Sequence, residues 1–129
     1  MPALDLIPVR GQIFVTESIP NLKLKATFHF DEGYIYFRNL GDRILLSGAR
    51  NQDFETENTG TLDLTEHIQN YLDNFLKKVI LPEEDFKISH RWSGIMAMSS
   101  DKSPIVKRFS ARQIVAVQLS GMGELVSKL

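Results

Sequence analysis

Three histidines are the residues of this sequence that most often bind metal ions or transfer protons. His29, His67 and His90 are widely separated, and no two of them are three or four residues apart. A helical metal site needs ligands at that spacing, so that both side chains lie on one face of the helix. The chain also has no cysteine, which excludes thiolate ligands and a cysteine nucleophile. We therefore expect no metal site.

Two further polar clusters match catalytic patterns in spacing alone. Ser99 and Lys102 have the S-x-x-K spacing of serine–lysine acyl enzymes, but that serine lies at a helix N-terminus, whereas Asp101 and Pro104 here indicate a turn. The adjacent carboxylates of residues 83–85 follow Pro82 in a loop, where they do not oppose each other across a bond. These residues predict no catalytic side chain.

Composition indicates one folded domain over residues 1–129. The chain is 43% hydrophobic and 24% charged, with a net charge of −1, so it can bury a core but has no net field to attract nucleic acid. We expect no nucleic-acid partner. The absence of cysteine suits the reducing cytoplasm, and the sequence shows neither a signal peptide nor an apolar stretch long enough to cross a membrane.

Strand patterns dominate the first third of the chain. Residues 9–16 are rich in β-branched and aromatic side chains, and residues 22–30 alternate strictly between apolar and polar, as in a strand with one face in water. Turn-forming residues then separate strands at 34–38 and 43–48. Successive strands joined by short turns predict an antiparallel meander.

The middle of the chain predicts one helix. Apolar residues recur at spacings of three and four over residues 63–80, with Asp63 as the N-cap, Glu66 three residues later, and Pro82 just beyond the end. The polar segment before it, residues 51–60, has no periodicity and predicts a surface loop that tolerates change.

Strand patterns return after the helix, within residues 86–99 and over residues 104–108 and 113–119. The order of strands, helix and strands predicts an α+β fold. We expect a mostly antiparallel, or mixed, sheet with one main helix packed on one face.

The most informative segment is RWSGIMAMSSDKSPIV, at residues 91–106. It resembles the W-x-G…T-x-D-x-x-P-x-[IV]-G stretch of the FAD-dependent oxidoreductase family that includes glycine and D-amino acid oxidases. The matching positions are Trp92, Gly94, Asp101 and Pro104.

Three more segments resemble the same family in the same order, so the resemblance covers nearly the whole chain. PVRGQ at residues 8–12 is similar to the strand that enters its substrate domain, and GYIYFRNLGDRILLSG at residues 33–48 is similar to its tyrosine-containing hairpin. IVAVQLSGMG at residues 114–123 resembles a strand and glycine turn near the flavin ring. The resemblance implies the substrate-binding, flavin-capping domain of an FAD-dependent amine or amino acid oxidoreductase.

This resemblance also implies roles for individual residues. Those expected to contact the substrate are Tyr34, Tyr36, Arg38 and Met96. Those expected to contact FAD are Arg10, Gln12, Trp92, Gly94, Gly121, Met122 and Gly123. No catalytic acid or base is expected from this chain, because the flavin itself accepts the hydride.

The chain departs from the family at three points. The family's substrate-binding arginine, two residues after the W-x-G glycine, is replaced by Met96, so that Arg38 or Arg91 would have to bind a carboxylate. The glycine expected after P-x-[IV] is Lys107. The glycine-rich motifs that bind phosphates, G-x-G-x-x-G and G-x-x-x-x-G-K-[ST], do not occur in the sequence. We therefore expect a domain that lacks its Rossmann partner, either excised from a longer enzyme or belonging to a split or decayed relative. We expect it to bind FAD weakly and to be inactive alone.

A second hypothesis is a stand-alone, non-catalytic α+β module that binds a small ligand or a protein. A half-buried pair such as Tyr34 and Tyr36 is common on any sheet, and Trp92 is equally typical of a core or an interface. Exposed apolar surface would favour a homodimer. The alternative role of Asp101 is that of a turn former. The alternative role of Arg91 is that of an ion-pair partner.

Overall fold

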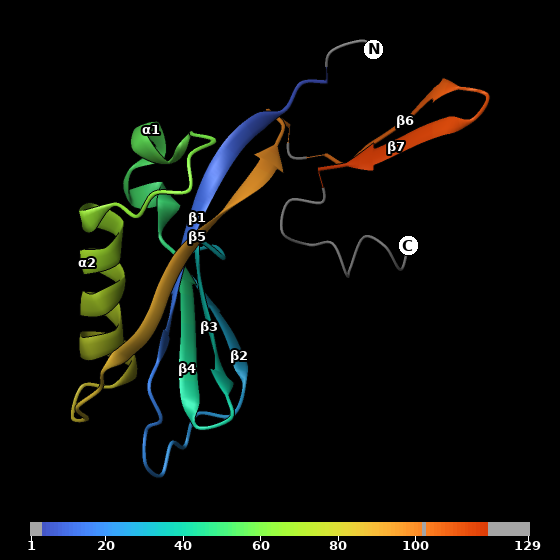
Figure 1. The fold of residues 1–129 in the computed structure, drawn as a ribbon. Coiled ribbons are helices and arrows are strands. Elements are labelled where there is room, and N and C mark those ends of the chain that lie inside the picture. Colours follow the sequence, from blue (N-terminus) through green and yellow to red (C-terminus); the bar gives the residue numbers. More distant parts are fainter. Residues whose placement is uncertain (1–3, 102, 119–129) are drawn as a thin grey trace.

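The computed structural model describes residues 4–101 and 103–118. They form a five-stranded sheet with helices on one side, and a separate two-stranded sheet (Figure 1). In chain order the elements are β1 (Ile7–Thr16), β2 (Thr27–Phe30), β3 (Ile35–Leu40), β4 (Arg43–Gly48), a 3₁₀ turn (Arg50–Gln52), α1 (Phe54–Glu57), α2 (Glu66–Phe75), a π-helical turn (Leu76–Ile80), β5 (Ile88–Met98), β6 (Ile105–Ser110) and β7 (Gln113–Val117).

The large sheet has the strand order β2-β3-β4-β1-β5, and each neighbouring pair in it is antiparallel. Strands β2, β3 and β4 form the predicted meander, and β1 lies between β4 and β5. The predicted α+β fold, with a mostly antiparallel sheet and one main helix, is confirmed.

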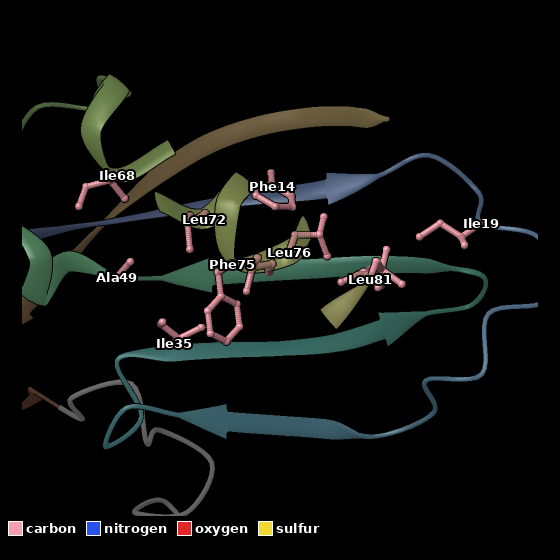
Figure 2. Close-up of a cluster of buried hydrophobic side chains, with 11 residues drawn as sticks. Phe14, Ile19, Ile35, Ala49, Ile68, Leu72, Phe75, Leu76 and Leu81 are labelled. Carbon is pink, nitrogen blue, oxygen red and sulfur yellow. The ribbon is translucent and has the colours of Figure 1, made fainter. Parts of the chain in front are cut away.

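The core lies between α2 and one face of this sheet (Figure 2). Residues directly opposite in antiparallel strands point to the same side, and Phe14 of β1 lies opposite Leu46 of β4. Both are fully buried in one cluster with Ile68 and Leu72 of α2. Each such side chain stabilises the fold by about 1.5–3 kcal/mol relative to an exposed one. The apolar stripe of the helix therefore packs on the sheet, as predicted.

The start of the helix was predicted three residues too early. Helix α2 begins at Glu66 with Thr65 as its N-cap, and Asp63 is exposed outside it. The hydroxyl of Thr65 makes no capping bond. Its oxygen accepts a hydrogen bond from the Gln12 side chain at 2.5 Å, and its hydrogen is donated to the carboxylate of Glu57 at 3.0 Å. A tertiary contact thus decides where the helix starts. The π-helical turn that follows α2 ends at Ile80, where the prediction ends the helix.

Most residues of segment 51–60 are exposed, as predicted, but the prediction of a loop is wrong. This segment contains the end of the 3₁₀ turn and helix α1, whose first turn is capped by Asp53 through a hydrogen bond from the Thr56 amide at 3.1 Å. Glu57, at the end of α1, is completely buried. Because the partners of this carboxylate lie on distant elements, local periodicity gave no sign of its burial.

Two predicted strand ranges are also corrected. Within residues 22–30 only Thr27–Phe30 pair with β3. Because Thr27 lies opposite Arg38 and β3 ends at Leu40, residues 22–24 lie beyond the end of β3. Tyr34, expected in a strand, lies in the turn that precedes β3.

Strands β6 and β7 form the two-stranded sheet, which projects from the large sheet in Figure 1. The connection to it contains the turn predicted at Asp101. The side chain of Asp101 accepts a hydrogen bond from the amide of Ser103 at 2.9 Å, as expected of a turn-forming aspartate.

Candidate functional site

The two faces of the large sheet differ in what covers them. We call the side that packs against α2 the helix face and the opposite side the open face. The pairing of strands assigns each side chain to a face, because directly opposite residues share one. The side chains assigned to the open face in the centre of the sheet are His29, Tyr36, Arg38, Leu45, Ser47, Val15, Ile13, Gly11, Val9, His90, Trp92, Gly94 and Met96.

Tyr36 is held in place on the open face by its neighbour on β4. Its hydroxyl lies 2.8 Å from the hydroxyl of Ser47, and Ser47 in turn donates to the carbonyl oxygen of Gln12 at 3.0 Å. Since a serine hydroxyl carries one hydrogen, Tyr36 donates to Ser47. The phenol oxygen retains lone-pair capacity and its ring is half-buried, so Tyr36 has a fixed position for contact with a ligand.

Arg38 lies two residues further along β3, opposite Leu45. Its side chain is exposed, and among the described residues no acidic partner lies within ion-pair distance of it. Residues two apart on a strand are separated by about 7 Å, so Tyr36 and Arg38 can reach the same small molecule. A free guanidinium is suited to a carboxylate, and the phenol oxygen of Tyr36 can accept a hydrogen bond from a donor such as an amine.

Trp92, Gly94 and Met96 lie along β5, at the edge of the sheet. Trp92 lies opposite Ile13, Gly94 opposite Gly11, and Met96 opposite Val9. The Trp92 side chain is 43% exposed. The register therefore brings five of the predicted site residues to one face: the three on β5 and the two on β3.

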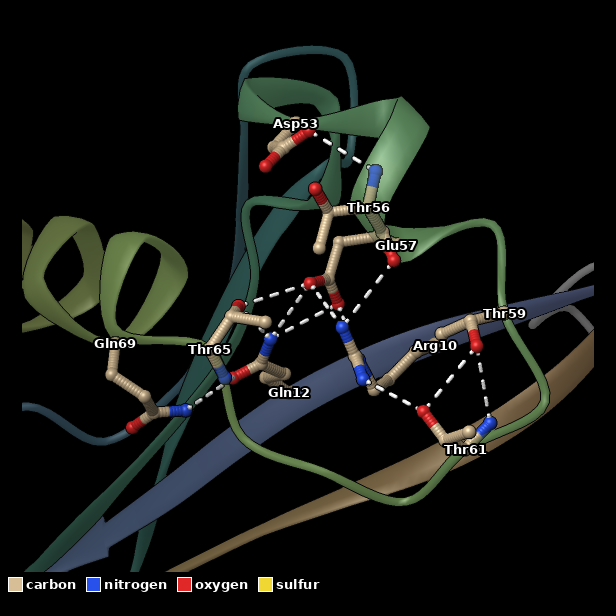
Figure 3. Close-up of polar contacts among 9 residues, drawn as sticks. All are labelled: Arg10, Gln12, Asp53, Thr56, Glu57, Thr59, Thr61, Thr65 and Gln69. Atoms are coloured by element: carbon tan, nitrogen blue, oxygen red, sulfur yellow. Dashed lines mark hydrogen bonds and ion pairs between the residues drawn. The ribbon is translucent and has the colours of Figure 1, made fainter.

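Arg10 and Gln12 lie on the opposite, helix face, since they alternate with Gly11 and Ile13 along β1. Both bind Glu57 (Figure 3). Arg10 makes two parallel hydrogen bonds to this carboxylate, at 2.9 and 3.0 Å, and Gln12 donates to the same carboxylate at 2.9 Å. Both side chains thus make their hydrogen bonds within the chain. The contact with FAD that the resemblance implies for Arg10 and Gln12 stays a prediction.

The electrostatics of this cluster favour its charged form. Burial by itself would raise the pKa of Glu57, but hydrogen bonds from Arg10, Gln12 and Thr65 outweigh it and hold the pKa below its ordinary value. Arg10 and Glu57 are each 3% exposed or less along the side chain. A paired and hydrogen-bonded buried charge of this kind joins α1 to β1.

Arg91 belongs to the same network rather than to the open face. It donates to Gln69 at 2.6 Å and makes a bidentate ion pair with Asp73 at 2.8 and 2.9 Å, both on α2. Its guanidinium also lies over the ring of Phe14, 5.1 Å from the centroid. Arg91 is thus an ion-pair partner. It is not placed to replace the family's substrate-binding arginine, whose position is Met96 in this chain.

Two other groups of predicted site residues lie elsewhere. Tyr34 lies in the turn before β3, where its ring packs edge-on against Phe54 at 5.7 Å and lies beneath the guanidinium of Arg50. Gly121, Met122 and Gly123 fall outside the described residues.

Glu57 is the important residue that sequence reasoning missed. A signal for it exists in β1, where Arg10 and Gln12 share a face with the core residue Phe14. A buried arginine requires an acidic partner, so this alternation predicts a buried carboxylate somewhere in the chain, although not its position.

The chain matches the sequence profile of the family described as FAD-dependent oxidoreductase over residues 1–127. It belongs to this family. The family is FAD-dependent, and FAD is accordingly the cofactor of the intact protein. No curated protein matches the chain by sequence.

Two solved structures are similar to the chain in fold. L-proline dehydrogenase from P. horikoshii superimposes with a TM-score of 0.70 at 19% identity, over 92% of this chain and 32% of that chain. Glycine oxidase from Geobacillus kaustophilus superimposes with a TM-score of 0.67 at 22% identity, over 98% of this chain and 35% of that chain. The chain thus spans about a third of the length of either protein.

The described residues fit one end of FAD and not the other. On the open face the exposed indole of Trp92 offers an aromatic surface that suits the planar flavin ring. For the phosphates, the sequence provides neither glycine-rich motif. Within residues 4–101 and 103–118 we find no group of three or more metal-ligating side chains, and no helix there is long and apolar enough to span a membrane.

Proposed function

We propose that the open face is the substrate-binding and flavin-capping surface of an FAD-dependent oxidoreductase that acts on an amine or an amino acid. The observation that carries this proposal is the gathering of five residues on one face, although they are far apart in sequence. These residues are Tyr36, Arg38, Trp92, Gly94 and Met96. Membership of the FAD-dependent family supplies the chemistry.

In this proposal the two strands have separate roles. Arg38 and Tyr36 orient the substrate, with the guanidinium on a carboxylate where the substrate has one. Trp92 lies against the flavin ring and excludes water from it, and Gly94 leaves open space beside the indole. FAD, when bound, would supply the acceptor for the hydride on the carbon next to the substrate nitrogen. The side chains of this chain bind and orient, and none of them is required to transfer a proton.

The partner of this surface is the FAD-binding part of a longer protein, which would hold the ADP half of the cofactor. We propose that the present chain alone binds FAD weakly and turns over no substrate. We further propose a cytoplasmic location and self-association through exposed apolar side chains such as Phe28 and Phe30 on the edge strand β2, which are 40% and 52% exposed. Size-exclusion chromatography with light scattering would test the self-association.

Trp92, the single tryptophan of the chain, reports directly on the proposed surface. The probe is lumiflavin, the isoalloxazine ring without the ADP half. We expect it to quench the fluorescence of Trp92 saturably. The control is the double variant Trp92→Phe, Val79→Trp, which moves the indole to an exposed position at the end of the helix; there the quenching should rise linearly, without saturation. Equal, non-saturating quenching in both proteins would refute the proposal.

A further inference from the structure

Two glycines face each other across the β1–β5 pair on the open face, Gly11 and Gly94. Neither has a positive φ angle, whereas Gly33, Gly41 and Gly48 do. The backbone at this pair is therefore compatible with any L-residue. Glycine in the interior of a strand destabilises it, because glycine loses more conformational freedom on folding and packs no side chain. A reason other than backbone geometry is needed for both residues.

Packing within the chain explains only in part why these two positions are glycine. A Cβ at Gly11 would lie 3.2 Å from Cε of Met96, the mobile end of an adaptable side chain. A Cβ at Gly94 would meet no atom of the described chain within 4 Å. The described residues thus leave the space above Gly94 open. In strand interiors such a glycine marks a point where a ligand or another backbone comes close.

The surroundings of the two glycines define the chemistry of that ligand. One neighbouring cross-strand pair on the open face is Ile13 with Trp92, and the other is Val9 with Met96. Among the described residues, these two pairs carry no charged side chain, and the arginine that the family resemblance places at Met96 is absent. An indole, a thioether and two aliphatic side chains around bare backbone are suited to an uncharged, apolar group.

We propose that Gly11 and Gly94 form the floor of a subsite for an uncharged apolar group of the substrate, an aromatic ring or an alkyl chain, with Trp92 and Met96 as its walls. Gly94 sets the size of the group that fits, because any side chain there occupies the open space. This inference rests on the proposed function, and it predicts that the substrate is an amine or amino acid with an apolar substituent rather than glycine itself.

The test uses benzylamine as the probe and the backbone amide resonances of the 129-residue chain as the readout. A ligand of this size in a weak, exposed site should bind with a Kd on the order of 1 mM. We expect saturable shifts centred on Gly11 and Gly94, and no competition by free glycine. Shifts centred elsewhere, or none that saturate, would overturn the proposal.

Substitutions at Gly94 separate a ligand site from a structural glycine. We expect Gly94→Ala to raise the Tm by about 1–4 °C, because it restricts the unfolded chain without strain, and to weaken benzylamine binding. Gly94→Val should weaken it further, by about tenfold or more. A lower Tm for Gly94→Ala, or unchanged binding by Gly94→Val, would show that this glycine serves the fold and would contradict the subsite.

Ala97→Val is the matched control, since Ala97 lies on the same strand, is exposed and points to the other side of the sheet. It should leave the Kd for benzylamine unchanged. The lumiflavin titration keeps the two proposals apart. Benzylamine binding at the glycine pair without saturable lumiflavin quenching would leave the subsite standing and refute the flavin-capping role, and the reverse result would refute the subsite alone.

Discussion

Strands β1 and β5 carry opposite kinds of surface on their two sides. On the helix face their charged side chains are paired: Arg10 is buried with Glu57, and the partly exposed Arg91 is paired with Asp73. On the open face the same strands present two glycines and the exposed Trp92. Side chains whose bonding groups are already matched within the chain hold the fold, whereas open space and unpaired groups are what an external ligand can use.

The largest expected effect is on the helix face. Arg10→Met should lower the free energy of unfolding by about 3–5 kcal/mol, because it leaves the carboxylate of Glu57 buried without its cationic partner. Urea denaturation of the variant and the unchanged chain measures the difference. Replacing both partners, as Arg10→Met with Glu57→Leu, should recover most of the loss. A loss below about 1 kcal/mol in the single variant would mean that the pair does not hold α1 to the sheet.

A smaller effect is expected from pH. Because the pKa of Glu57 is below its ordinary value of 4.5 in the folded chain, the folded state favours the carboxylate. The resulting stabilisation is complete above that ordinary value and is lost as the pH falls through the lower folded-state pKa. Protonation should destabilise less than Arg10→Met, since the neutral acid still hydrogen-bonds. Thermal unfolding over this acidic range should show a decline in Tm that Glu57→Gln makes shallower; an unaltered decline would assign it to other groups.

On the open face a hydrogen bond between neighbouring strands gives the next effect. Tyr36→Phe removes the hydroxyl that lies 2.8 Å from Ser47, and a typical hydrogen bond of this kind contributes about 0.5–1.5 kcal/mol. Ser47 keeps its bond to the carbonyl of Gln12, which limits the damage. Chemical denaturation measures the change. A loss as large as that of Arg10→Met would indicate that the open face, too, holds the fold together.

The smallest effect is expected from Arg38→Met, the same chemical change as Arg10→Met but on the other face. Arg38 is exposed and has no ion-pair partner among the described residues, so its loss should alter the free energy of unfolding by less than about 0.5 kcal/mol. Denaturation of the two arginine variants side by side gives the sharpest form of the comparison. Similar losses from both would remove the distinction between the faces.

Local sequence patterns predicted much of the fold, and the errors of the prediction have non-local causes. Strand β4 has its predicted bounds, because turn-forming residues flank a short apolar run. Residues 22–24 alternate like a strand but lie beyond the end of β3. Helix α2 starts late because Thr65 bonds to Glu57. In each case a distant partner, which periodicity does not encode, decides the outcome.

The candidate site was predictable in its residues but not in its arrangement. Family motifs singled out Trp92, Gly94 and Arg38, yet only the register of the strands places them on one face. The same register puts Arg10 and Gln12 on the other face, although they directly neighbour an open-face glycine in sequence. Because side chains alternate along a strand, adjacent residues lie on opposite faces of the sheet and cannot contact the same ligand.

The most direct test of the account is a lumiflavin titration followed through methyl resonances on both faces. The account predicts saturable shifts for Ile13 and Met96 on the open face, with Ile44 and Ile68 in the core unchanged. Shifts confined to the core and helix face, or spread equally over both faces, would contradict the claim that the open face is where this chain meets its flavin and substrate.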